Sequence, residues 1–228
     1  MKKILLFLLF FVPTFLSPMR ANGSKKINFY AIYKDIPKDL KKKITGVSYN
    51  PECIDIKELC LLKVLHWGFD GKIHEGEMIV NKKIAGEVID IFSELFTAKY
   101  PIEKIRLINE YDADDDKSME DNNSSALCCR VITGDENKQN PRWSLHSYGT
   151  AIDINPFQNP YVKPKKNLVL PKGSEEYVDR TNVRLGMIVK GDACHKAFTS
   201  RGWIWGGDWD VNDEKGRVDY QHFHKELG

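Results

Sequence analysis

The chain has 228 residues, of which 42% are hydrophobic and 29% charged, a composition typical of a globular protein. This length is sufficient to bury an apolar core without help from disulfides or a metal ion. The formal net charge is only +2, with lysines and acids interspersed, so nothing in the charge pattern indicates nucleic acid or an anionic membrane as a partner.

The N-terminal residues predict an export signal. Lys2 and Lys3 precede an apolar run, residues 4–16, which is shorter than the roughly 20 residues that a membrane-spanning helix needs. With residues 1–21 removed after Ala21, residues 22–228 would be one domain, a monomer in the periplasm or outside the cell. A retained N-terminal anchor is the alternative.

Apolar periodicity predicts the elements that follow. Helices are expected at 52–67, 82–99 and 192–201, and strands or extended segments at 102–111, around Arg130, at 150–155 and at 218–223. The acidic stretch 112–125 is interpreted as a solvated turn, and the proline-rich stretch 156–182 as mostly irregular. Helices first and strands later favour an α+β domain with an antiparallel sheet.

The five cysteines allow disulfides in an exported chain. Adjacent Cys128 and Cys129 would point to opposite faces of a strand and should not bridge each other. Cys53 with Cys60, or Cys129 with Cys194, are the possible pairs. No CxxC spacing is present, which disfavours a zinc site built from cysteines.

The central motif is the segment Ser144-Leu-His146-Ser-Tyr-Gly149-Thr-Ala151-Ile-Asp153. Gly149 permits a sharp bend, after which Asp153 falls in an apolar strand on the same face as Ala151. A buried carboxylate there needs a cation or hydrogen-bond donors, and a metal ion shared with His146 would satisfy it. An aspartate that accepts hydrogen bonds from backbone amides explains the pattern equally well.

The closing segment Asp219-Tyr-Gln-His222-Phe-His224 supplies further candidates. Two histidines two residues apart share one face of a strand, so either could complete a three-ligand site with an open fourth position. Asp219 could then act as general base on a water molecule. On its own, the segment is better explained as a surface histidine cluster.

Two other features have weaker support. Arg130 could hold a substrate carboxylate or stabilise an oxyanion, although a lone arginine more often forms a surface ion pair. Trp203, Trp205 and Trp209 flank a glycine turn and could line a ligand groove or fill the core.

Taken together, these stretches resemble a known family. The pattern SxHxxGxAxD followed by DxxH is similar to the VanY/VanX-type zinc D-Ala-D-Ala carboxypeptidases and L-alanyl-D-glutamate endopeptidases, and the resemblance extends over about 68–228. It implies the hedgehog/DD-peptidase fold, an antiparallel sheet flanked by helices.

The resemblance also implies roles for individual residues. One Zn²⁺ would be held by His146, Asp153 and His222, with His224 as the alternative third ligand. The catalytic residues would be Asp219, as general base, and Arg130. Residues that contact the substrate would include Ser144, Tyr148 and Trp205.

The implied activity is hydrolysis of peptidoglycan stem peptides by attack of zinc-bound water. The D-Ala-D-Ala carboxypeptidase and L-Ala-D-Glu endopeptidase activities both stay open, because they use the same ligands and base. The alternative function is a non-catalytic zinc-containing module on the same fold that binds peptidoglycan or signals.

Overall fold

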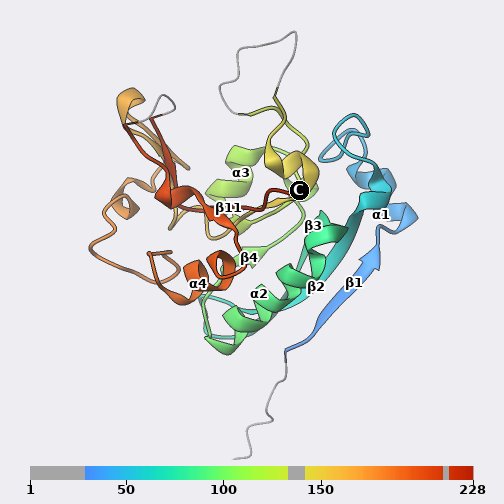
Figure 1. Ribbon diagram of the computed structural model, residues 1–228, viewed down its shortest axis with the longest axis horizontal. Coiled ribbons are helices and arrows are strands. Elements are labelled where there is room, and N and C mark those ends of the chain that lie inside the picture. The colour runs from blue at the N-terminus through green and yellow to red at the C-terminus, as the bar shows by residue number, and fades with distance from the viewer. Residues whose placement is uncertain (1–28, 133–141, 213–215, 228) are drawn as a thin grey trace, which may run out of the picture.

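The computed structural model describes residues 29–132, 142–212 and 216–227. It has an α+β fold of small, mostly antiparallel sheets with a few helices, as the sequence predicts (Figure 1). The predicted export signal lies outside the described residues. No helix in the described ranges is long and apolar enough to cross a membrane.

The N-terminal half is built on one three-stranded antiparallel sheet. Its order is β1 (Ala31–Asp35), β2 (Leu59–Trp67) and β3 (Ile73–Asn81). Helix α2 (Ala85–Thr97) packs on this sheet, and the short helix α1 (Lys38–Ile44) follows β1 (Figure 1). Ile44, at the end of α1, belongs to the apolar cluster on the face of the sheet opposite α2, so β2 is covered on both faces.

The prediction of a helix at 52–67 is wrong, because strand β2 occupies most of that range. Alternate side chains of β2 enter two different apolar clusters, with Leu62 and Val64 on the α2 side and Leu59 and Leu61 on the other. A strand buried on both faces has a nearly continuous apolar sequence, which periodicity cannot distinguish from a helix.

The helix predicted at 82–99 is confirmed. A short 3₁₀ helix (Lys82–Ile84) leads into α2, and the Asn81 side chain caps its start by accepting a hydrogen bond from Lys83 N. The predicted apolar face is buried, including Val88 and Phe92.

The segment from 102 to 131 is less regular than predicted. Instead of a strand over 102–111, only β4 (Lys104–Ile105) forms, paired in parallel with β5 (Asn123–Ser124). The acidic stretch is not a simple solvated turn, because helix α3 (Asp115–Glu120) forms within it. No strand forms around Arg130, where the described residues show only an isolated bridge between Val131 and Trp143.

Two small antiparallel sheets form the C-terminal half. One has the order β6 (Ala151–Asp153), β11 (His222–His224) and β9 (Ile204–Trp205), and the other the order β10 (Val218–Asp219), β7 (Tyr161–Lys163) and β8 (Leu168–Leu170). Helix α4 (Ala193–Thr199) completes this half. The elements predicted at 150–155 and 192–201 are confirmed in shorter form, whereas the single segment predicted at 218–223 is two strands, β10 and β11, in different sheets.

The disulfide differs from both predicted pairs, since Cys53 is joined to Cys129. Cys60 and Cys194, the partners proposed from sequence, are buried in the main apolar cluster and remain free thiols, as does Cys128. The prediction that Cys128 and Cys129 do not bridge each other is confirmed.

Candidate metal centre

His146 lies in a short 3₁₀ helix, η4 (Leu145–Tyr148), that ends at Gly149. The Ser144 hydroxyl caps this helix by accepting a hydrogen bond from His146 N at 3.4 Å. Gly149 has φ +64°, and a Cβ there would lie 2.8 Å from Asn81 N, so only glycine fits without strain. The bend predicted at Gly149 therefore places His146 beside strand β6.

Asp153 and His222 face each other across two paired strands. They are direct partners in the antiparallel register of β6 and β11. Backbone hydrogen bonds in both directions tie Asp153 to Ser125, at 2.9 and 3.1 Å. The carboxylate and the imidazole are thus positioned by the backbone of three chain segments.

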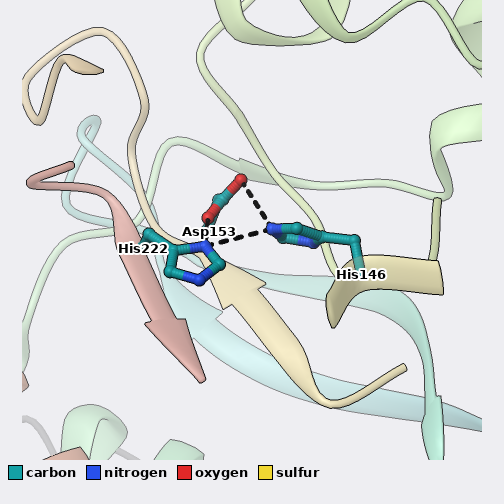
Figure 2. A group of neighbouring side chains, drawn as sticks. All are labelled: His146, Asp153 and His222. Carbon is teal, nitrogen blue, oxygen red and sulfur yellow. Dashed lines mark hydrogen bonds and ion pairs between the residues drawn. The ribbon is translucent and has the colours of Figure 1, made fainter. Parts of the chain in front are cut away.

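The three side chains converge on one point (Figure 2). His146 Nε2 lies 3.2 Å from Asp153 Oδ2 and 3.2 Å from His222 Nδ1, and His222 Nδ1 lies 3.0 Å from Asp153 Oδ1. One potential ligand atom from each residue lies within 4.8 Å of the others. The fold therefore brings together the three candidate ligands predicted from sequence, His146, Asp153 and His222.

The chemistry of this donor set fits a divalent metal ion. A tetrahedral ion with bonds of about 2.0–2.2 Å spaces its ligand atoms about 3.3–3.6 Å apart, slightly more than the separations found here. His146 Nδ1 lies 2.7 Å from the Ala126 carbonyl oxygen, which only accepts, so Nδ1 carries a proton. In the neutral ring Nε2 then presents its lone pair to the cluster, the arrangement typical of metal-binding histidines.

Charge also favours a cation at this point. Burial opposes ionisation of Asp153, but His146 and His222 outweigh it and hold the pKa of this carboxyl well below its usual range. Burial lowers the pKa of His222 despite the hydrogen bond to Asp153, whereas at His146 the charge of Asp153 outweighs burial and raises the pKa. An ionised carboxylate and a neutral imidazole are the forms that bind metals.

The cluster opens into a cavity of about 520 Å³. Among the residues predicted from sequence, the cavity lining includes all three candidate ligands together with Arg130, Ser144, Asp219 and His224. Tyr148 and Trp205, which the family resemblance suggested as substrate contacts, do not belong to the lining. The Trp205 indole is buried and donates a hydrogen bond to Tyr220 O.

Asp219 has an unsatisfied oxygen and lines the same cavity as the cluster. Its Oδ1 is buried and has no hydrogen-bond partner among the described residues. Burial and the negative charge of Asp153 raise the pKa of Asp219 well above its usual range. A Cβ on Gly206 would lie 2.5 Å from the Asp219 carbonyl oxygen, so the turn predicted around this glycine brings the chain close to the acid.

Arg130 forms an ion pair that sequence analysis missed. Its guanidinium contacts the carboxylate of Asp115, the first residue of α3, and both side chains are partly buried. Burial raises the pKa of Asp115, and the charge of Arg130 opposes that shift. The prediction of a solvated acidic stretch is therefore wrong for Asp115, whose partner lies 15 residues further along the chain and is brought to it by the tertiary fold.

The three tryptophans separate into two environments. Trp203 and Trp205 are buried in the main apolar cluster, the core-filling alternative. Trp209 lines the cavity and packs on the rings of His222 and His224, with centroids 5.5 and 6.2 Å apart. Sequence alone could not divide the cluster in this way, because all three residues surround the same glycine turn.

The C-terminal part of the chain is similar to a known family. Residues 138–225 match the family model described as D-alanyl-D-alanine carboxypeptidase, which confirms the resemblance stated from sequence. The three candidate ligands and Asp219 lie within the match, whereas Asp115 and Arg130 precede it. No curated protein and no solved structure matches the chain.

Proposed function

We propose that this chain, whose residues 138–225 match the D-alanyl-D-alanine carboxypeptidase family model, is an exported zinc-dependent peptidase that cleaves stem peptides of peptidoglycan. The observation that carries the proposal is the convergence of His146, Asp153 and His222 at the base of a cavity that also contains Asp219.

Three protein ligands are the number expected of a catalytic zinc rather than a structural one. When bound, a zinc ion would polarise the scissile carbonyl and lower the pKa of a water molecule. His146, Asp153 and His222 hold the ion in this proposal. His224 follows two residues after His222 and lines the same cavity, where it packs beside the third ligand at a centroid distance of 5.2 Å.

Asp219 is the general base of the proposed reaction. Its Oδ1 accepts a proton from the attacking water and then returns it to the leaving amine, so that the acid is unchanged at the end of the cycle. Two features support this role. The oxygen has no competing donor among the described residues, and the side chain lines the same cavity as the three proposed ligands.

Arg130 stabilises negative charge that develops on the carbonyl oxygen. Its backbone is held by Ser147, whose Oγ accepts from Arg130 N at 3.0 Å and donates to Arg130 O at 2.9 Å. The ion pair with Asp115 orients the guanidinium. A cation held in place before the reaction stabilises the transition state without paying for reorganisation.

The direct test is digestion of defined stem peptides by the zinc-loaded protein, with products identified by mass spectrometry. We expect loss of a terminal D-Ala or scission between L-Ala and D-Glu, and no product with the Asp219→Asn variant. If every peptide stays intact while the protein carries zinc and binds peptidoglycan, the non-catalytic module replaces the peptidase as the function.

A further inference from the structure

The cavity holds a second arginine to which neither the motif nor the proposed mechanism assigns a role. Arg217 lies two residues before Asp219, directly before strand β10, and Val218 between them is buried. Because side chains alternate along a strand, Arg217 and Asp219 point to the same side, and both line the cavity.

Arg217 is held by an aromatic ring that also contacts the metal cluster. Its guanidinium carbon lies 4.8 Å from the centroid of the Trp209 ring, and that ring packs on His222 at 5.5 Å. Tyr161 pairs with Asp219 across β7 and β10, and although burial raises the pKa of Tyr161, the nearby charge of Arg217 opposes that shift. The Trp209 indole therefore contacts both Arg217 and His222, a proposed metal ligand.

The charge of Arg217 is not neutralised by an ion pair. Within the described ranges no carboxylate lies within 4.0 Å of its guanidinium, and its Nε is buried without a hydrogen-bond acceptor. Arg130 in the same cavity, by contrast, is paired with Asp115. A partly buried guanidinium with spare donors needs an acceptor, and a carboxylate is the group that fits its fork.

We propose that Arg217, stacked on Trp209, binds the free C-terminal carboxylate of the peptide being cleaved. This inference rests on the proposed function and specifies which peptide bond of the substrate is cleaved. An anchor for a terminal carboxylate beside the metal ligands selects the last peptide bond of the substrate, so the chain acts as a carboxypeptidase rather than as an endopeptidase. Arg130 remains available for the carbonyl oxygen.

The test compares two peptides that share one scissile bond. One is a stem peptide ending in D-Ala-D-Ala as the free acid, and the other is the same peptide with a C-terminal amide. The zinc-loaded protein should cleave the free acid with a kcat/KM about 10- to 100-fold higher, the range expected for hydrogen bonds to a charged group. Arg217→Gln should abolish this preference by raising KM for the acid.

Two further variants sharpen the comparison. Arg217→Lys keeps the charge but not the two-donor fork, and should retain only part of the preference. Arg106→Gln, at an exposed arginine outside the cavity, should behave as the unmodified protein. Dissociation constants of both peptides for the Asp219→Asn protein, measured with and without Arg217→Gln, give a readout that does not depend on turnover.

The outcomes separate this inference from the proposed function. Equal cleavage of acid and amide, or a preference that survives Arg217→Gln, overturns the assignment of Arg217 and leaves the peptidase standing. Cleavage of neither peptide overturns the peptidase. If Asp219→Asn protein nevertheless binds the acid at least about tenfold more tightly, and only with Arg217 present, the carboxylate site is supported.

Discussion

At the scale of single residues, the proposed catalytic residue Arg130 has one partner, Asp115, that precedes the family match and another, Ser147, that lies within it. Asp115 begins helix α3, and Ser147 lies in the helix that carries His146, yet both act on Arg130. A guanidinium held by a carboxylate and by its own backbone contacts loses little conformational freedom when it binds a developing oxyanion.

Asp115→Asn should therefore lower kcat/KM by about tenfold or more, because the guanidinium of Arg130 loses the charge that orients it. Zinc content should not change, since Asp115 is not a ligand. Steady-state kinetics and elemental analysis on the same preparation check both statements. Asp90→Asn, on the exposed surface of α2, is the matched control. An unchanged kcat/KM in Asp115→Asn would show that Asp115 does not position Arg130 for the reaction.

Much of the candidate site could be predicted at this scale. The family resemblance indicated His146, Asp153 and His222 as ligands, whereas spacing and strand alternation alone left His222 and His224 as alternatives on one face. Asp115 could not be predicted, because its partner is set by the tertiary fold. Arg217 could have been, since it alternates with Asp219 in the same way as the two histidines do.

At the scale of elements, the site depends on one turn that joins η4 to β6. Gly149 adopts a left-handed conformation and packs against the end of β3, where its carbonyl accepts a hydrogen bond from Asn81 N at 2.9 Å. This contact ties the His146 helix to the N-terminal sheet. The position of His146, a proposed metal ligand, therefore depends on the position of β3.

Gly149→Ala should destabilise the protein by about 2 kcal/mol or more, from left-handed strain and the clash with Asn81 N. Gly86→Ala is the contrasting change, since a Cβ at this position in α2 meets nothing within 4 Å. It should stabilise by about 0.5–1 kcal/mol, because alanine is the better helix former. Urea unfolding midpoints measure both, and shifts in the same direction would contradict the argument.

Elements were predictable where only one face of a segment is buried. The α2 helix shows a single apolar face and was predicted with nearly correct ends. Strand β2 is buried on both faces, so its sequence lacks the alternation that marks a half-buried strand. The segment 102–111 has apolar weight for a strand, but the backbone turns into a short 3₁₀ helix (Ile108–Tyr111) after two paired residues.

At the scale of the whole molecule, a disulfide joins the N-terminal half to the segment that carries Arg130. Cys53 and Cys129 are 76 residues apart in sequence, and Cys129 is adjacent to Arg130. Cys129 N also donates a hydrogen bond to Ser48 O at 2.9 Å. An exported protein can keep such a bond oxidised.

Reduction of this disulfide should lower the free energy of unfolding by about 4 kcal/mol, the value expected for closing a loop of this length. Denaturant unfolding with and without a phosphine reductant measures the difference. The double variant Cys53→Ser/Cys129→Ser should match the reduced protein and be insensitive to the reductant. Equal midpoints for the oxidised and reduced protein would show that the disulfide does not stabilise the fold.

The central claim is that His146, Asp153 and His222 together bind one zinc ion, and the zinc content of purified variants tests it most directly. We expect about one zinc per chain in the unmodified protein, in Asp219→Asn and in His224→Ala, because none of these changes removes a proposed ligand. His146→Ala and His222→Ala should bind almost none. An unmodified protein without zinc, or retention in His222→Ala with loss in His224→Ala, would contradict the account.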